Sequence, residues 1–395
     1  MELNKTWSGD VPKEFIKKRF KFCYTYSHAG AVIDKSWWHK GNEILYTCQE
    51  TPMYSDYDSF PNSLRTKEKD LLLTRNATPY IFIPQLNSIY SNVVQKVTIK
   101  TSEYSIPYLR YVLICATDSV QVNGNTIPSW NMGVWDNLYL PIPPLEKQNE
   151  IVHYLNNKLD LIDELIDCKT EQVRELENFK YNYINELLTK TSNVARVDSF
   201  SSLTKGPFGS DMKKSIFVEK SDYSKKVYIQ VNCIQNDETL GDYYITNSYY
   251  HEMSRFKVRP KDILISCDGT LGKVVQLSDE CEEGVISPSL LRVRLNEDKI
   301  SSRYFIYCWE YYLLNNLIKD TRNACLVHLP SASLIGRAKI PYLPLEEQNS
   351  IVEKIDSFSA KINELITIKK NKIEELNSYK KSLIFECVTG KKEVI

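Results

Sequence analysis

The sequence has no run of about 18 apolar residues, the length that a transmembrane helix needs, so it predicts no membrane span. It begins Met-Glu-Leu-Asn-Lys-Thr-Trp, without an apolar signal region, and we therefore expect a cytoplasmic protein. Its ten cysteines are scattered from Cys23 to Cys387 with no Cys-x-x-Cys pair. This spacing indicates reduced, partly buried thiols rather than a disulfide framework or a zinc site.

Motifs of several enzyme classes are also missing. The sequence contains no Gly-x-Gly-x-x-Gly, no His-Glu-x-x-His, no Gly-x-Ser-x-Gly and no Asn-Pro-Pro-[Tyr/Phe] of amino-methyltransferases. The five histidines show no metal-ligand spacing. Residues 268–274 have a superficial likeness to a phosphate-binding loop, but the consensus needs glycine where Cys267 stands and a hydroxyl where Val274 stands. Nothing in these patterns positively suggests an enzyme. We expect no metal or cofactor in the chain itself, and a turn between two strands at residues 268–274.

Charge is balanced overall but unevenly distributed. The 395 residues include 50 Lys and Arg and 50 Asp and Glu. Residues 1–144 hold 15 basic and 13 acidic residues and residues 191–340 hold 20 and 18, whereas residues 145–190 hold 6 and 10 and residues 341–395 hold 9 and 9. The small positive excess therefore lies in the globular segments. A nucleic-acid partner would need local basic patches, or a second protein that adds positive charge.

One pattern occurs twice, 200 residues apart. Residues 139–152 read Tyr-Leu-Pro-Ile-Pro-Pro-Leu-Glu-Lys-Gln-Asn-Glu-Ile-Val, and residues 339–352 read Lys-Ile-Pro-Tyr-Leu-Pro-Leu-Glu-Glu-Gln-Asn-Ser-Ile-Val. The same offset holds without a gap to Thr189 and Thr389. A repeat of this length predicts an alternation of globular domain and helix. The expected segments are a domain at 1–144, a helical spacer at 145–190, a domain at 191–340 and a helical spacer at 341–395.

Each spacer has the apolar spacing of a coiled-coil helix. Its heptad seam needs an apolar partner, and the other copy is the nearest one. Lys169 and Lys180, like Lys369 and Lys380, interrupt the seam; they would either extend to the rim and discourage other registers, or mark where the helices separate. We expect an antiparallel coiled coil of about 65 Å, from about 43 residues at roughly 1.5 Å each, with the two halves of the chain related by an approximate two-fold axis. The predicted seam residues are Leu155, Leu159, Ile162, Ile166, Val173 and Leu176, and Ile355, Ile362, Ile366, Ile373 and Leu376.

The two globular segments share a second motif. Residues 69–78 and 261–270 both follow the pattern Lys-Asp-[Leu/Ile]-Leu-[Leu/Ile]-[Thr/Ser]-x-[Asn/Asp]-x-Thr. In both segments a strand-like run comes next, followed by a helical stretch rich in tyrosine. The same order of elements predicts two copies of one mixed α/β domain.

Two stretches of the globular segments have side chains suited to nucleic acid. Trp37-Trp38-His39-Lys40 could stack on bases, or its aromatic residues could belong to the core; the sequence leaves both open. Gly206-Pro207-Phe208-Gly209 predicts a tight loop, with Lys205, Lys213 and Lys214 beside it. An ordinary surface turn is the alternative for this second stretch.

Two tandem domains, each followed by a long helix entered through Pro-Leu-Glu-[Lys/Glu]-Gln at residues 144–148 and 344–348, resemble the specificity (S) subunit of Type I restriction-modification systems. The resemblance covers nearly the whole chain. Residues 205–210, 262–266 and 269–273 are also similar to motifs of the target recognition domains of these subunits.

The resemblance implies a non-catalytic, sequence-specific subunit that binds double-stranded DNA. Each target recognition domain would read one half of a bipartite site, and the helices would separate the halves. Two modification (methyltransferase) subunits, which bring S-adenosylmethionine and methylate adenine, would dock on the helical regions, and restriction subunits would join them. Such partners explain the weak net charge, because they could supply much of the phosphate neutralisation.

Base readout would fall to polar and cationic loop residues, with Arg and Lys favouring guanine and Asn and Gln favouring adenine. The first domain departs from the family pattern: it has no Gly-Pro-Phe-Gly loop, and Asn76-Ala-Thr78 stands where the second domain has Asp268-Gly-Thr270. The candidates for DNA contact are Trp38, His39, Lys40, Arg75 and Asn76 in the first domain, and Lys205, Ser210, Lys213, Lys214 and Lys273 in the second. The candidates for partner docking are Pro144, Leu145, Gln148, Pro344, Leu345 and Gln348.

Two other functions compete with DNA recognition. A structural scaffold would use the helices to display two protein-interaction domains, and it would show no sequence-specific retention of DNA. A fused nuclease or methyltransferase would need a metal or cofactor site that the sequence does not contain.

Overall fold

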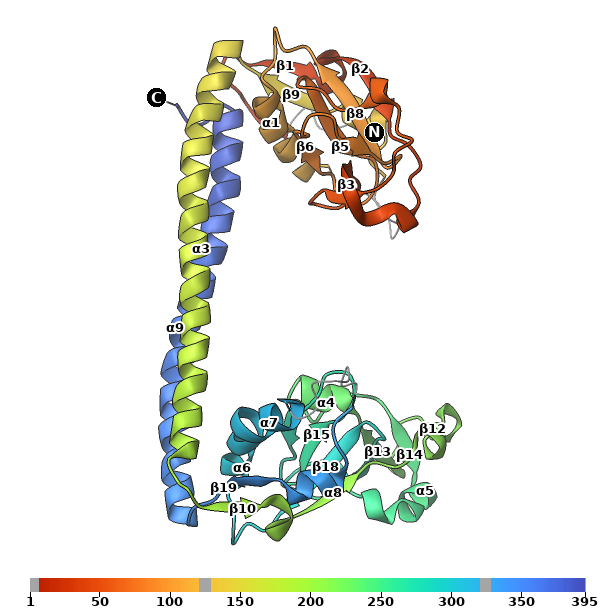
Figure 1. Ribbon diagram of the computed structural model, residues 1–395, viewed down its shortest axis with the longest axis vertical. Helices are drawn as coiled ribbons and strands as arrows, with labels where there is room; N and C mark the ends of the chain where they lie inside the picture. Colours follow the sequence, from red (N-terminus) through yellow and green to blue (C-terminus); the bar gives the residue numbers. More distant parts are fainter. Residues whose placement is uncertain (1–6, 121–128, 320–327, 395) are drawn as a thin grey trace. The chain divides into compact units, whose positions relative to one another are not determined.

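The computed structural model describes residues 7–120, 129–319 and 328–394 of the chain (Figure 1). The chain divides into two compact units: residues 1–171 with 369–395, here the first unit, and residues 172–368, the second unit. Each unit therefore combines one globular domain with part of each long helix. Among the described helices, none has the length and apolarity that a membrane span would require.

The first unit contains two sheets and a separate strand pair. A four-stranded sheet has the order β2-β8-β5-β6, a three-stranded sheet has the order β4-β3-β7, and β1 pairs with β9. The strands are β1 (Ile16–Arg19), β2 (Tyr24–Ala29), β3 (Trp38–Tyr46), β4 (Met53–Ser55), β5 (Asp70–Thr74), β6 (Ile81–Phe82), β7 (Ile89–Tyr90), β8 (Val94–Ile99) and β9 (Tyr139–Ile142). The helices are α1 (Ile106–Asp118) and α2 (Met132–Asp136), with α3 (Leu145–Thr189) and α9 (Leu345–Val388) shared between the units.

The second unit repeats this plan. Its sheets have the orders β11-β18-β15-β16 and β12-β14-β13-β17, and β10 pairs with β19. The strands are β10 (Val194–Arg196), β11 (Ser201–Lys205), β12 (Phe217–Val218), β13 (Ser224–Tyr228), β14 (Tyr244–Thr246), β15 (Ile263–Ser266), β16 (Val274–Gln276), β17 (Gly284–Ile286), β18 (Leu290–Leu295) and β19 (Lys339–Pro341). The helices are α4 (Gln230–Ile234), α5 (Asn247–Glu252), α6 (Ser302–Cys308), α7 (Leu314–Lys319) and α8 (Ala332–Arg337), with a π-helical turn at Trp309–Leu313 between α6 and α7.

The predicted duplication is confirmed strand by strand. β5 and β15, which come from the shared Lys-Asp motif, are each paired in antiparallel fashion on both edges. All residues of β5 and β15 are buried, which explains why their sequences read as continuous apolar runs instead of alternating patterns. In the other sheet of each unit, β3 with β7 and β13 with β17 form parallel pairs at matching places. The turn predicted at residues 268–274 connects β15 to β16.

A buried ion pair is also repeated. In the first unit Asp70 accepts a hydrogen bond from the hydroxyl of Thr98 at 2.6 Å, and the ammonium of Lys96 lies 3.5 Å away. In the second unit Asp262 accepts two hydrogen bonds from Arg294, each of 2.7 Å, and Arg292 lies 3.9 Å away. Asp70 and Asp262 are both about 1% exposed. The aspartate of the shared motif therefore ties its strand to the neighbouring one.

Each long helix is joined to its domain through a glutamine. Gln148 accepts a hydrogen bond from the backbone of Ser105 and donates to the carbonyls of Glu103 and Pro143, at 2.8–3.1 Å. Gln348 makes the same three bonds with Ser301, Lys299 and Leu343 at 2.7–3.1 Å (all in the second unit). Both side chains are fully buried. The prediction that these two glutamines dock a partner is wrong, because their polar groups are used inside the unit.

The remaining docking candidates lie at the helix starts. Pro144 and Pro344 are exposed, and Leu145 and Leu345 are half-buried. These four positions keep accessible surface, so docking there stays a prediction.

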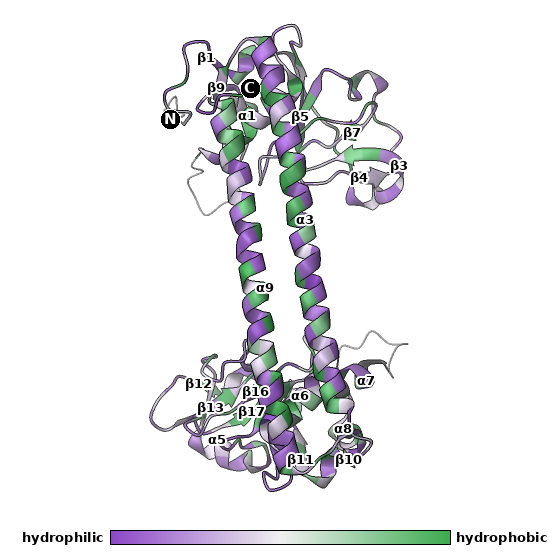
Figure 2. Ribbon diagram, turned by 90° about the vertical axis from the view of Figure 1, so that its left-hand side faces the viewer, coloured by the Kyte–Doolittle hydropathy of each residue, from purple (hydrophilic) through white to green (hydrophobic). Residues whose placement is uncertain are grey.

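The two long helices pack against each other within each unit, in antiparallel directions. In the first unit Leu155, Leu159 and Ile162 of α3 share a core cluster with Leu383 and Ile384 of α9. In the second unit Ile184 and Leu187 of α3 share a core cluster with Ile355 of α9. A smaller cluster in the same unit holds three seam residues, Val173, Ile362 and Ile366. Green and purple bands alternate along both helices in Figure 2, as the heptad pattern requires. Of the predicted seam, Leu155, Leu159, Ile162, Val173, Ile355, Ile362 and Ile366 are buried, and Ile166, Leu176, Ile373 and Leu376 are half-buried.

Two of the lysines that interrupt the seam bind the opposite helix. Lys180 donates to the side-chain oxygen of Asn363 at 3.0 Å in the second unit. Lys380 contacts both carboxylate oxygens of Asp163, at 2.5 and 2.6 Å, in the first unit. The two pairs correspond under the 200-residue offset. They are specific contacts between the helices, so these two lysines do not mark a place where the helices separate.

Candidate nucleic-acid interface

In each unit, three loops meet at one edge of the four-stranded sheet. In the second unit β11 and β15 end there, and β16 and β18 begin there, because neighbouring strands are antiparallel. In the first unit β2 and β5 end, and β6 and β8 begin, at the matching edge. We call this the loop edge of each sheet. Its segments are residues 30–37, 75–80 and 91–93 in the first unit, and residues 206–216, 267–273 and 287–289 in the second.

A glycine begins the first loop of each edge. The backbone N–H of Gly206 donates to the carbonyl of Leu290 at 2.8 Å, and that of Gly30 donates to Val94 at 3.1 Å. A methyl group on Gly206 would lie 1.9 Å from the carbonyl oxygen of Ser287, and one on Gly30 would lie 2.1 Å from that of Tyr90. Only glycine allows the backbone to approach this closely. Gly30 is therefore the counterpart of Gly206, although the first domain lacks the Gly-Pro-Phe-Gly sequence.

The side chains two residues after these glycines point into solvent. Phe208 is 82% exposed and Val32 is 79% exposed. Among the large apolar residues that the structure describes, Tyr223 is the only other one with a comparable exposure, 83%. Both loop edges thus display one apolar side chain at the same position.

The second loop of each edge is a tight turn. Ala77 has φ of 60° and Gly269 has φ of 60°, and each follows a residue that forms an isolated β-bridge, Asn76 with Ser129 and Asp268 with His328. The positive φ is easy for glycine and strained for alanine. The two turns are therefore equivalent, as the sequence comparison of these segments suggested, and the first unit keeps the conformation at a cost in strain.

Charged groups gather on the turn of the second unit. Asp268 receives a hydrogen bond from the imidazole of His328 at 2.7 Å, and the ammonium of Lys205 lies 3.7 Å away. Burial alone would raise the pKa of Asp268, but the contacts with His328 and Lys205 outweigh it and lower the pKa below its usual value. The amide of Gln230 also binds the backbone carbonyl of Asp268. Lys205 and His328 stay largely exposed, so both remain available to an anion.

A short 3₁₀ helix ends the first loop in both units. It spans Lys35–Trp37 in the first unit and Lys214–Ile216 in the second, and each begins with an exposed lysine. The next residue pairs with a neighbouring strand in both cases, Trp38 with Ser55 and Phe217 with Ile245. Lys35 is therefore the counterpart of Lys214, and each loop edge combines an exposed apolar residue with at least one exposed cation.

A family model for the type I restriction modification DNA specificity domain matches the chain twice, at residues 16–178 and 208–375. Each match covers one globular domain and much of the helix that follows. The chain belongs to the type I restriction-modification specificity family.

Curated specificity subunits resemble the chain over about two thirds of its length. The type I restriction enzyme MjaVIII specificity subunit of Methanocaldococcus jannaschii is 24% identical over an aligned length of 301 residues, and the match covers 69% of this chain and 67% of that subunit. The putative MjaX specificity subunit of the same organism is 25% identical over 271 residues, 65% of this chain and 60% of that subunit. The chain thus aligns with only three fifths of the second relative.

Solved structures of this family share the fold. A chain from a type I R-M system superposes with a TM-score of 0.74 at 14% identity, covering 97% of this chain and 100% of that one. The HsdS subunit from Thermoanaerobacter tengcongensis gives a TM-score of 0.52 at 14% identity, covering 97% and 98%. At this identity the likeness speaks for the fold alone: a mixed α/β protein with two tandem domains and a long helix after each.

The structure brings most second-domain candidates of this specificity protein to the loop edge. Lys205, Ser210, Lys213 and Lys214 are exposed and lie on or beside its first loop. Lys273 is exposed at the end of the second loop. It also lines a cleft of about 1220 Å³, together with Lys180 of α3, Asp356 of α9 and Glu310 of the π-helical turn. Burial raises the pKa of Glu310 despite the nearby positive charge of Lys273.

The first-domain candidates are more dispersed. Arg75 is half-buried and donates to the carbonyl of Asn92 at 3.1 Å, and Asn76 is exposed, so both lie at the loop edge. Trp38 is half-buried against a core cluster, so the core alternative describes it better than base stacking. His39 and Lys40 are exposed on β3, outside the loop edge, and Lys40 donates to the carbonyl of Ser36.

Sequence analysis missed three residues of the first loop edge: Gly30, Val32 and Lys35. A signal for Lys35 existed, because Lys35-Ser36-Trp37-Trp38 and Lys214-Ser215-Ile216-Phe217 both read Lys-Ser followed by two large apolar residues. No such signal marked Gly30 or Val32. Lys35 comes five positions after Gly30, whereas Lys214 comes eight positions after Gly206, so the two loop sequences do not align.

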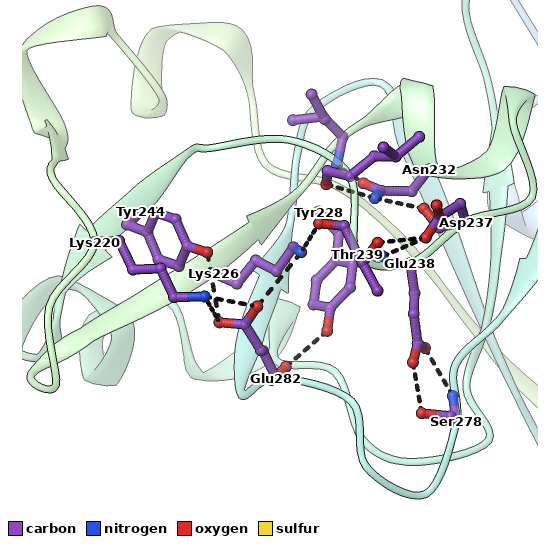
Figure 3. A network of polar contacts seen from close by, with 12 residues as sticks. Lys220, Lys226, Tyr228, Asn232, Asp237, Glu238, Thr239, Tyr244, Ser278 and Glu282 are labelled. Atoms are coloured by element: carbon purple, nitrogen blue, oxygen red, sulfur yellow. Dashed lines mark hydrogen bonds and ion pairs between the residues drawn. The ribbon is translucent and has the colours of Figure 1, made fainter.

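A polar network in the second unit ties β13 to the segment that precedes β17 (Figure 3). Lys226 on β13 is 1% exposed; it donates to the carbonyl of Thr239 at 2.8 Å and lies 3.6 Å from the carboxylate of Glu282. Tyr228, two residues on, donates to the carbonyl of Glu282 at 2.8 Å and accepts through its own carbonyl a bond from Ser287. The network therefore holds β13 beside the start of β17, and β17 leads to the third loop of the edge.

Among the described residues, no three His, Cys, Asp or Glu side chains gather closely enough to hold a metal ion. The charged and polar groups of the loop edge are instead those that contact phosphates and base edges in protein–DNA complexes.

Proposed function

We propose that this chain is the DNA-recognition subunit of a type I restriction-modification complex, and that each loop edge reads one half of a bipartite target on double-stranded DNA. The observation that carries the proposal is the loop edge built twice, with an exposed cation and an exposed apolar residue at matching positions. Cations there would hold phosphates, and the remaining side chains would contact bases in the groove. The chain itself would be non-catalytic and would act in the cytoplasm.

The chemistry would come from partners. Two modification subunits would bind S-adenosylmethionine and methylate adenine, and restriction subunits would join the complex. The chain's own charge is balanced, so binding at physiological salt would depend on phosphate contacts made by these partners.

The proposal is tested by adding the purified chain to its modification subunits and a duplex library with randomised positions, and by mapping the methylated adenines. Methylation confined to one bipartite sequence is the expected result. Methylation without sequence preference, or at the same sites when this chain is left out, would show that the chain does not read DNA.

Exposed leucines on the long helices support docking of the modification subunits. Leu165 on α3 in the first unit is 50% exposed, and Leu365 on α9 in the second unit, its counterpart at the 200-residue offset, is 46% exposed. Neighbouring Leu161 and Ile368 are exposed as well. One apolar helix face in each unit therefore offers one site for each of two identical subunits.

Charge on these leucines should prevent assembly. The single variants Leu165→Glu and Leu365→Glu are each expected to bind one modification subunit in place of two, and the double variant none, as measured by light scattering after gel filtration. Both side chains are already exposed, so the fold should not change. Glu353→Lys, an exposed charge reversal elsewhere on α9, is the control. Full assembly of the double variant would place the docking surface elsewhere.

The helices are proposed to set the spacing between the half-sites. Seven residues inserted after Glu171 and seven after Ile368, where the compact units divide, keep the heptad register. They add about 10 Å at roughly 1.5 Å per residue, which corresponds to about three base pairs at 3.4 Å each. We expect the methylated sequence to keep both half-sites and to gain about three base pairs between them. An unchanged spacer would contradict this role of the helices.

A further inference from the structure

Val32 and Phe208 occupy the same local geometry in the two loop edges. Each stands two residues after a glycine whose backbone is held against the next strand, so each is placed by a rigid support. Each is about four-fifths exposed, although a buried position would be more favourable for an apolar side chain of this size. Since a duplicated chain has kept this arrangement in two loops of different length and sequence, the exposed apolar group has a use in itself.

The surroundings of both residues select DNA as the partner. Exposed lysines lie on the same loop in each unit, Lys35 after Val32, and Lys213 and Lys214 after Phe208. In the second unit Lys205 precedes the glycine, and His328 lies next to Asp268 on the adjoining turn. The lysines around the apolar side chain would bind phosphates on the two DNA strands. This would bring the apolar side chain toward the groove between the two strands.

DNA presents apolar groups of three kinds: base faces, sugars and the 5-methyl group of thymine. Base faces are covered by stacking, and exposing them costs several kcal/mol. Valine has no ring with which to replace the lost stacking, so insertion of the side chain between stacked bases does not suit both positions. Sugars carry no sequence information. The thymine methyl group, which lies at the edge of the major groove, is the one apolar group that both valine and phenylalanine can recognise.

We propose that Val32 and Phe208 are matched specificity residues, each of which contacts the 5-methyl group of a thymine in the half-site read by its own domain. This inference rests on the proposed function, because it requires that each domain reads a half-site. It adds the position in each loop and the chemical group on the base. The clamped glycine and the residue two positions later would then form the same reading device in both domains.

The test removes only the methyl group. Once the target is known from the methylation map, duplexes are made in which each thymine of the target is replaced in turn by uracil. Binding and methylation by the complex with its modification subunits are then measured. For the wild-type chain we expect one thymine in each half-site at which uracil weakens binding about fourfold, which is the contribution of one buried methyl group.

Substitutions on the protein should erase that sensitivity one half-site at a time. Phe208→Ala is expected to make binding indifferent to uracil in one half-site and to leave the other as before, and Val32→Ala should do the reverse. Both side chains are exposed, so the unfolding temperature should not change. Tyr223→Ala is the matched control, because it removes an equally exposed aromatic ring. Tyr223 lies just before β13, at the end of that strand away from Ser287.

The outcomes separate the inference from the proposed function. The inference is wrong, and half-site reading stands, if the wild-type complex discriminates sequences but no uracil substitution weakens its binding. The same holds if Phe208→Ala and Val32→Ala keep the full response to uracil. If the wild-type complex shows no sequence preference, the proposed function fails and the inference fails with it.

Discussion

Replacing Asp262 with alanine is expected to lower the free energy of unfolding of the second unit by about 3–5 kcal/mol. The carboxylate is 1% exposed and accepts bonds from the guanidinium of Arg294 and, at 2.8 Å, from the backbone of Arg259. Without it, Arg292, which is 6% exposed, stays buried with its negative partner removed. Leaving a buried cation unpaired costs much more than the intact pair contributes. Urea unfolding followed by circular dichroism measures the effect.

Two further variants make the result interpretable. Glu297→Ala breaks the exposed ion pair with Lys261, next to Asp262 in sequence, and should change stability by at most about 1 kcal/mol. Asp70→Ala removes the matching carboxylate of the first unit. It should lower the urea concentration at which the first unit unfolds, a midpoint that Asp262→Ala leaves unchanged. Equal effects of Asp262→Ala and Glu297→Ala would mean that the buried pair does not hold the sheet.

The long helices were predictable because their signal is local. A heptad pattern fixes which face of a helix is apolar. The 200-residue repeat placed the first helical spacer from residue 145, where α3 begins, and the second from residue 341, four residues before α9 begins at Leu345. The same repeat relates Lys180 and Asn363 in one unit to Lys380 and Asp163 in the other. What the pattern did not contain was the partner of each lysine, because that depends on the antiparallel register.

The glutamines of the helix entry show the limit of motif reading. The resemblance to the specificity family implied that partners dock at the repeated Pro-Leu-Glu-x-Gln sequence. Its glutamine instead satisfies the backbone groups of Ser105 and Glu103, or of Ser301 and Lys299, which are more than 40 residues away along the chain. A buried polar side chain with long-range partners cannot be told from an exposed one by local sequence.

The loop edge was half predictable for a related reason. The Lys-Asp motif and the Asn76 and Asp268 turns align in sequence, and both turns were found at the same edge. Gly30 and Gly206 align only in space, because what they share is a close backbone approach and not a neighbouring sequence. Trp38 packs partly against a core cluster, the alternative that the sequence left open, because of the sheet around β3.

Replacing Gly206 with alanine is expected to weaken recognition of one half-site by about tenfold or more while the other half-site is read normally. The new methyl group would lie 1.9 Å from the carbonyl oxygen of Ser287 and 3.0 Å from the Cα of Pro288, both backbone atoms, so the loop must move. Overpacking of this kind costs about 1–3 kcal/mol of stability. Displacing the loop also removes several contacts, each of which contributes about 1–3 kcal/mol of discrimination.

The same loop supplies the control for this prediction. Gly209 has no described atom within 4 Å of the place where its methyl group would stand, and its φ is not positive, so Gly209→Ala should leave both stability and the methylation map unchanged. Gly30→Ala, which would meet the carbonyl oxygens of Tyr90 and Ser91 at 2.1 and 2.3 Å, should transfer the loss to the other half-site. If Gly206→Ala behaves like Gly209→Ala in the methylation map, the clamped glycine does not position the reading loop. If Gly30→Ala and Gly206→Ala impair the same half-site, the two loop edges do not divide the target between them.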